Sequence, residues 1–194
     1  MPRLWSRVTP ALADFTRCVR TSAGLAARGR LASPDTYVGA RLHFADGTSS
    51  LVFRETALRG GRTSDPAVLV IQFRLAALGS NGFLHAAFRR EYILHTPLFA
   101  GFPGFRSKLW ADDVDTGVYR GLYEWQDPRS ATHYAQRMVA LLAPFSNAGT
   151  ARYHVIAQLR RDEFVADPHA ASGGPADGWW RLAYPVTVQP AHAG

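Results

Sequence analysis

The chain has 194 residues, of which 47% are hydrophobic and 12% aromatic, so wholesale disorder is excluded and a packed core is expected. Its formal charge of +7 comes almost entirely from scattered arginines, and no nucleic-acid-binding motif accompanies them, so we predict no nucleic-acid partner. The single cysteine, Cys18, excludes an internal disulfide and a cysteine-based metal cluster.

Hydropathy and N-terminal charge indicate where the protein resides. No apolar stretch is long enough to cross a bilayer, and Asp14 and Arg17 interrupt what would have to be the core of a signal peptide. We therefore expect a cytoplasmic protein with no membrane partner.

The first sixty residues predict a helix followed by a β-hairpin. The helix covers residues 1–31 and ends near Gly29, since glycine commonly terminates helices. The hairpin has strands at 37–44 and 50–57 around the turn residues Asp46-Gly47.

A glycine-rich linker at residues 60–66 separates this hairpin from the rest of the chain. We therefore predict three units. They are an N-terminal helix and hairpin extension at 1–62, a main domain at 67–160 and an irregular C-terminal tail at 161–194.

The main domain contains predicted elements in the order strand, helix, strand, strand, helix, strand. They lie at residues 68–74, 81–95, 105–110, 118–125, 129–143 and 152–159. Asp127 is expected to cap the second helix, with Pro128 as its first residue. This βαββαβ order predicts an α+β, ferredoxin-like fold with both helices on one face of an antiparallel sheet.

The strand at 118–125 presents large aromatic side chains on one face. Tyr119, Tyr123 and Trp125 alternate with Arg120 and Glu124, so the two groups point to opposite faces of the sheet. Because so much aromatic surface does not stay in water, we expect a second copy of the chain to cover it and predict a homodimer.

Short motifs in the main domain resemble those of the dimeric α/β-barrel proteins, in particular YdhR-type and antibiotic-biosynthesis-monooxygenase-like proteins. The motifs are Pro103-Gly104-Phe105, Lys108-Leu109-Trp110, Gly117-Val118-Tyr119, Leu122-Tyr123-Glu124-Trp125 and the helix start Ala131 to Tyr134. The resemblance covers residues 67–160. It implies a barrel formed by two sheets across a dimer, with a pocket between sheet and helices in each subunit. Members include cofactor-free oxygenases, cyclases, isomerases and haem-degrading enzymes, so the fold does not select a reaction.

The predicted helix at residues 81–95 carries a candidate acid–base pair. Glu91 and His95 are four residues apart within a stripe of core-facing residues that includes Phe88. In the functional interpretation Glu91 orients His95, which removes an acidic proton from a substrate. In the alternative interpretation the two residues form a structural pair.

Aromatic residues supply a candidate substrate wall. Trp110, Tyr119 and Tyr123 come from strands, and Phe88 and Tyr134 point inward from helices. They could stack on a planar ligand. As core or dimer-interface residues, they need no ligand.

Polar residues on the strands form a further candidate group for ligand binding. Of this group, we include Arg120 among the substrate-binding residues. In an uninterrupted register one sheet face holds Arg106, Lys108, Arg120, Glu124, His154 and Gln158. This face would be either an internal polar layer or the wall of an anion-binding pocket. A β-bulge would shift the register and change the set.

These features predict a cofactor-independent monooxygenase or cyclase of secondary metabolism that acts on a planar aromatic or polyketide-like molecule. No metal motif is present, and we predict no cofactor. The resemblance implies that haem degradation needs Asn, Trp and His together, and Gln72 stands where the Asn is expected, whereas haem binding through His95 stays open. The alternative functions are a non-catalytic dimeric binding protein for a hydrophobic metabolite or haem, and a structural subunit.

Overall fold

A computed structural model describes residues 2–61, 63–74, 76, 99–113, 115–171 and 173–187, with backbone alone for residues 2–13. The predicted helix at 81–95, with Phe88, Glu91 and His95, lies outside the described residues.

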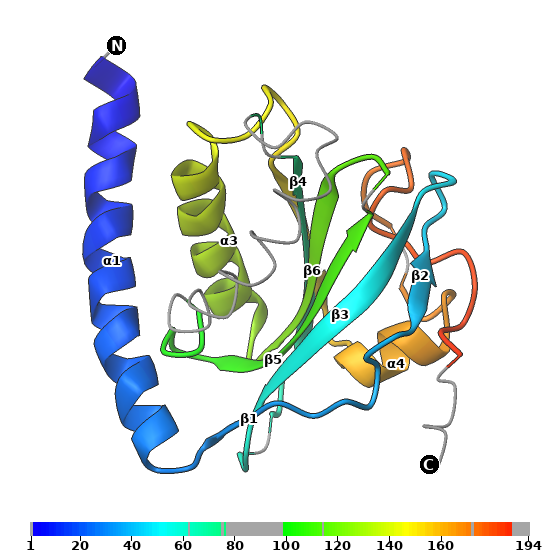
Figure 1. Ribbon diagram of the computed structural model, residues 1–194, viewed down its shortest axis with the longest axis horizontal. Helices are drawn as coiled ribbons and strands as arrows, with labels where there is room; N and C mark the ends of the chain where they lie inside the picture. Colours follow the sequence, from blue (N-terminus) through cyan, green and yellow to red (C-terminus); the bar gives the residue numbers. More distant parts are fainter. Residues whose placement is uncertain are drawn as a thin grey trace.

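The described residues form a seven-stranded antiparallel sheet with helices, which confirms the α+β class (Figure 1). Its strands are β1 (Leu31–Ala32), β2 (Arg41–His43), β3 (Ser49–Leu58), β4 (Ala67–Arg74), β5 (Phe105–Asp113), β6 (Val118–Trp125) and β7 (Arg152–Ala157). The helices are α1 (Pro2–Ala27), α3 (Pro128–Leu142) and α4 (Arg161–Ala166). Across the described part of the chain, none of the helices is both long and apolar enough to cross a membrane.

Strands of the main domain pair in the order β5-β6-β4-β7. β4 is therefore central, as its continuous apolar sequence predicts, and all but its last residue are buried. The predicted helix at 129–143 is confirmed as α3. The side chain of Asp127 caps it by accepting a hydrogen bond from the Ser130 amide at 2.8 Å, and Pro128 follows the cap. The helix after β4 falls outside the described residues.

The N-terminal hairpin belongs to the same sheet. β3 pairs with β5 from Leu51 opposite Asp112 to Ala57 opposite Ser107, so the sheet continues beyond the βαββαβ strands. The glycine-rich linker at 60–66 therefore joins two strands of one sheet. The division of the chain into three units stays a prediction.

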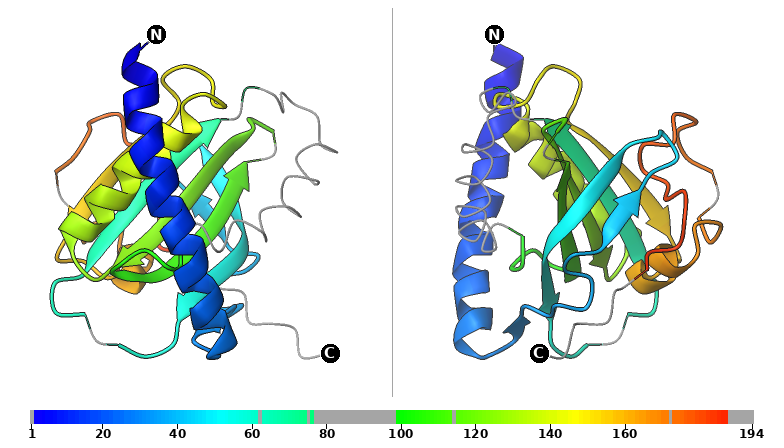
Figure 2. Two further views of the ribbon diagram at one scale, coloured as in Figure 1. Left: turned by 90° about the vertical axis from the view of Figure 1, so that its left-hand side faces the viewer. Right: turned by 45° about the vertical axis from the view of Figure 1, so that its right-hand side comes forward.

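One face of the sheet, which we name the helix face, is covered by α3 and, beyond it, by α1 (Figure 2). Tyr119, Tyr123 and Trp125 are all buried here. The Trp125 and Tyr134 ring centroids lie 4.8 Å apart, so these aromatics pack under α3. Our reason for expecting a second copy over them is therefore wrong, because the chain's own helices provide the cover. The homodimer itself stays a prediction.

The opposite face, which we name the tail face, is covered by the C-terminal segment and β2 (Figure 2). Trp179, Trp180 and Leu182 are almost completely buried against it, together with Phe164 of α4 and Phe44. The prediction of an irregular tail is wrong where α4 forms, and the tail is an integral layer of the fold.

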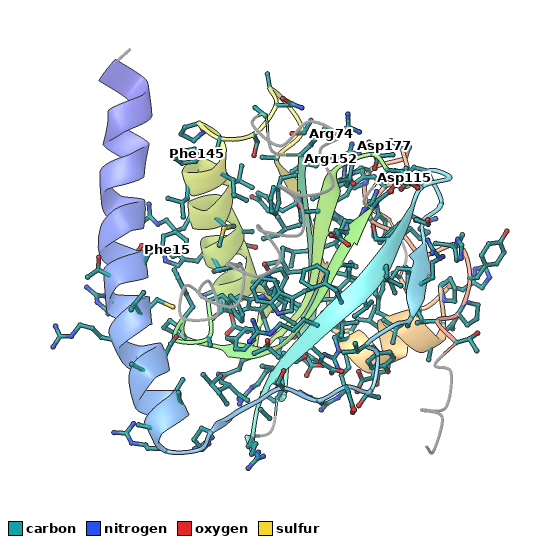
Figure 3. The ribbon with its side chains drawn as sticks, in the orientation of Figure 1. Phe15, Arg74, Asp115, Phe145, Arg152 and Asp177 are labelled. Carbon is teal, nitrogen blue, oxygen red and sulfur yellow. The ribbon has the colours of Figure 1, made fainter. Side chains whose placement is uncertain are left out.

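Ion pairs hold the tail to the sheet. Arg161 of α4 lies 2.7 Å from Glu55 of β3, and the side chains of both residues are buried. At the other end of the sheet, Arg152 of β7 lies 2.7 Å from Asp177 (Figure 3). The buried pair is the more constraining, since removal of either partner would leave an uncompensated charge in the core.

If the tail is a true core layer, Trp180→Ala should lower the free energy of unfolding by about 3–5 kcal/mol, the usual cost of deleting a buried tryptophan. Tyr184→Ala is the control, because Tyr184 lies in the same segment but is 66% exposed, and its effect should stay within about 0.5 kcal/mol. Urea unfolding measures both. A small, equal effect for the two variants would show that the tail does not cover the sheet.

Candidate active site

A buried lysine stands inside an aromatic cluster on the helix face. Lys108 is 5% exposed, and its Nζ lies 3.1 Å from the centroid of the Trp110 ring. The rings of Phe99 and Tyr123 lie 4.7 and 4.8 Å from the same atom. We name Phe99, Lys108, Trp110 and Tyr123 the lysine cluster. Its geometry allows cation–π attraction from three rings.

A β-bulge in β5 creates this arrangement. The register against β6 shifts between Phe105 and Ser107, so that Lys108 pairs with Tyr123 and Trp110 with Gly121. Without the extra residue, Lys108 and Trp110 would point to the other face. The bulge therefore brings Lys108 and Trp110 to the face that already holds the aromatic residues of β6.

A glycine makes room for the tyrosine of the cluster. A Cβ atom on Gly121 would lie 2.5 Å from the Tyr123 ring, closer than a real side chain tolerates. The missing side chain at this position therefore lets the Tyr123 ring lie back along β6. From the loop before β5, Phe99 closes the cluster with its ring centroid 5.0 Å from that of Trp110.

The environment shifts the proton equilibria of the site. Burial lowers the pKa of Lys108 well below its usual value, and the positive charge of Arg54 lowers it further. Burial raises the pKa of Tyr123, so its phenol stays protonated and shares a 3.3 Å hydrogen bond with the hydroxyl of Tyr134. A lysine with a lowered pKa can change charge when a ligand arrives, which is a property of functional sites.

The N-terminal extension contributes to the same site through β3. A second bulge, between Val52 and Arg54, leaves Phe53 packed in the helix-face core and pairs Arg54 with Trp110. The Arg54 guanidinium lies 5.5 Å from the Trp110 ring centroid, and burial lowers its pKa. The Trp110 indole N–H donates a 3.0 Å hydrogen bond to the Thr56 hydroxyl.

The sequence-predicted wall residues are brought together in part. Trp110 and Tyr123 belong to the lysine cluster, and Tyr134 lies beside Tyr123 with ring centroids 5.4 Å apart. Tyr119 shares the helix face but lies at the start of β6, away from the lysine cluster. Its ring stacks on that of Phe73 with a centroid distance of 5.5 Å. Phe88, Glu91 and His95 lie outside the described residues, so their roles stay predictions.

Arg120 lies on the opposite, tail face and is bound to its own chain. Its guanidinium donates to Gln72 at 3.1 Å, Ser50 at 2.9 Å and Thr48 at 2.6 Å, and it lies 3.6 Å from Asp46. Burial is the main cause that lowers its pKa to about 10. The structure thus separates Arg120 from Trp110, Tyr119 and Tyr123, and these contacts hold the β2–β3 turn against the sheet.

The polar residues that we predicted to share one face lie on both faces of the sheet. Arg120 and Glu124 share the tail face, whereas Lys108 lies on the helix face because of the bulge in β5. Sequence reasoning included Lys108, the only lysine in the chain, in this polar group but did not place it beside the aromatic wall residues. It missed Phe99 and Arg54, which reach the cluster through a loop and a second bulge that leave no clear local signal.

The described residues do not provide a metal or haem site at the lysine cluster. They contain no group of three His, Cys, Asp or Glu side chains that could hold a metal ion. Their histidines lie elsewhere: His133 is 3.6 Å from Asp14 on the outer side of α3, His154 packs on Trp180, His43 lies beside Tyr184, and the His169 amide donates to Asp167 just after α4. Within these residues, therefore, no imidazole is available here as an axial ligand, and we derive no step through haem.

Comparison with known proteins finds similar solved structures, all at low identity and low TM-score. No family model and no curated protein matches the sequence. Similar solved structures include a ferredoxin-fold protein related to antibiotic biosynthesis monooxygenases from Listeria monocytogenes 4b F2365, with 12% identity and a TM-score of 0.40 over 59% of this chain and 66% of that protein. A monooxygenase-like protein from Listeria innocua has 12% identity and a TM-score of 0.36 over 56% and 63% of the two chains.

A third similar structure is the haem-degrading enzyme LmHde from Listeria monocytogenes, with 10% identity and a TM-score of 0.38 over 64% of this chain and 95% of that enzyme. At such low identities and TM-scores the likeness transfers neither an activity nor a site, so function must be argued from the residues themselves.

The pKa of Lys108 can be measured directly because the chain has no other lysine. In protein labelled with ¹³C at the lysine ε-carbon, the single side-chain NMR signal should titrate with a midpoint below the ordinary value of 10.5. Arg54→Met should raise that midpoint, since it removes a nearby positive charge. A midpoint at or above 10.5 in the folded protein would contradict the buried position of Lys108.

The same shift makes stability depend on pH. Between the lowered pKa and 10.5 the unfolded chain holds a proton on Lys108 that the folded chain has released, so the free energy of unfolding rises with pH in this window. Relative to Lys108→Met, the wild type should gain at most about 1.4 kcal/mol per pH unit there. Urea unfolding of both proteins across this range measures the gain, and a constant difference would contradict it.

Proposed function

We propose that the chain is a monooxygenase- or cyclase-like enzyme that binds a planar aromatic or polyketide-like molecule at the lysine cluster. The observation that carries this proposal is the buried Lys108 amine among the rings of Phe99, Trp110 and Tyr123 on the helix face. Aromatic rings favour stacking against a planar ligand, and a cation beside them favours a ligand that carries or develops negative charge.

The proposed chemistry starts with removal of an acidic proton. His95, oriented by Glu91, is the proposed base, and its product is a delocalised substrate anion. Lys108 in its ammonium form stabilises that anion from the side of the sheet. The Tyr123 phenol lies beside it and keeps its proton because burial raises its pKa.

The anion can then react in two ways without a cofactor. In an oxygenase reaction dioxygen is the oxidant, so an activated CH₂ group becomes a carbonyl and one water molecule leaves. In a cyclase reaction the carbanion attacks a carbonyl carbon of the same molecule, and no oxidant is needed. Both reactions need a site that excludes water, which suits the buried aromatic lining of the lysine cluster.

Binding can be tested with 2-naphthol as a planar phenol. Trp110→Leu should weaken its binding about tenfold, because a ring contact and its buried area are lost. Trp179→Leu is the matched control, since Trp179 is equally buried but packs on the tail face, and it should leave the affinity unchanged. Isothermal titration calorimetry measures both. Equal losses in the two variants would contradict a ligand site at the lysine cluster.

Catalysis is tested at the proposed base. Once a substrate is found in a panel of planar phenols, His95→Phe should lower turnover by about two to four orders of magnitude and retain binding. His133→Phe is the control, because the His133 side chain is 52% exposed on α3. A wild type that binds the panel but turns none of it over would favour the alternative, a binding protein for a hydrophobic metabolite.

A further inference from the structure

Two cationic side chains flank the Trp110 indole on the helix face. The Lys108 Nζ lies 3.1 Å and the Arg54 Cζ 5.5 Å from the centroid of its ring. Arg54 faces Trp110 across the β3–β5 pair, and Lys108 lies two residues before Trp110 on β5. Like charges this close repel each other, and Arg54 accordingly contributes to the lowered pKa of Lys108.

The Arg54 guanidinium has donor capacity to spare. Its Nη1 atom is buried and makes no hydrogen bond, and no ion pair of Arg54 is found among the described residues. The neighbouring acidic residue of β3, Glu55, points to the tail face and pairs with Arg161. A buried donor without an acceptor costs roughly 1–3 kcal/mol, so its retention here needs an explanation.

We propose that Arg54 and Lys108 together bind an anionic group, a carboxylate or phenolate, of the planar ligand. This inference rests on the proposed function and narrows its substrate to a planar aromatic acid. The ring of such a ligand lies against Trp110 and Tyr123, and its anion meets the guanidinium fork and the amine. Arg54 is then a binding residue supplied by the N-terminal extension.

The bulge in β3 supports this assignment. Between Val52 and Arg54 the strand shifts its register, which places Arg54 opposite Trp110 rather than opposite Leu109, its partner in an uninterrupted register. In a regular strand Arg54 would share the face of Val52, which is buried in the tail-face core. Bulges at sheet edges commonly re-aim a side chain toward a site. Here the bulge brings a cation beside the lysine cluster.

The test uses the full chain and compares two probes of nearly the same shape, the anion 2-naphthoate and the neutral amide 2-naphthamide. By isothermal titration calorimetry at neutral pH, the wild type should bind 2-naphthoate at least about tenfold more tightly than 2-naphthamide. Arg54→Met should lower the 2-naphthoate affinity about tenfold and leave 2-naphthamide unchanged. Arg54→Lys, which keeps the charge, should recover part of the loss.

The single lysine gives a second readout. On binding of 2-naphthoate, the titration midpoint of the labelled Lys108 signal should rise, because a nearby anion favours the ammonium form, whereas 2-naphthamide should leave it unchanged. Arg41→Met is the charge control, since Arg41 is an exposed residue of β2, and it should bind both probes like the wild type.

The outcomes separate this inference from the proposed function. Equal binding of both probes by the wild type, with competition by 2-naphthol, would overturn the anion site and leave the planar-ligand function standing. An equal loss of 2-naphthoate affinity in Arg41→Met and Arg54→Met would also overturn it, because the effect would then be general charge attraction. If neither probe nor 2-naphthol binds, both the inference and the proposed function fail.

Discussion

The central strand β4 is buried on both faces, and this constraint determines the layers on either side of it. An antiparallel sheet with two apolar faces is stable in water only if both are covered. The helix face of this sheet is covered by α3 and α1, and the tail face by α4, β2 and the segment around Trp180. One chain therefore provides, within itself, the cover that the resemblance assigns to a partner subunit.

The two faces differ in whether their arginines have acidic partners among the described residues. On the tail face, Arg120 and Arg161 reach acceptors of their own chain, so these guanidinium groups hold the layers together. On the helix face, Lys108 and Arg54 lie against aromatic rings, which attract cations but do not neutralise them. The Arg54 guanidinium, whose buried Nη1 makes no hydrogen bond, is thus a helix-face cation with a donor to offer a ligand.

Much of the fold could be predicted because its signals are local. The apolar run of β4, the Asp127 cap of α3 and the Asp46-Gly47 turn each depend on residues adjacent in sequence. The site could be predicted less well, because the bulge that turns Lys108 toward Tyr123 depends on pairing between strands. The burial of Trp180 depends likewise on contacts with strands far away in the sequence.

The position of the tail in the sequence has a consequence for synthesis. Phe44 bridges to Leu182 across the tail face, so this layer closes only after Leu182 has left the ribosome, long after the strands that it covers. Until then the tail-face side chains of β4 and β6, such as Val68, Val70 and Leu122, have no cover from that segment. Contacts this distant in sequence form slowly, and a nascent sheet with an open apolar face is prone to aggregate. The segment around Trp180, made after every strand of the sheet, is therefore one on which the solubility of that sheet depends.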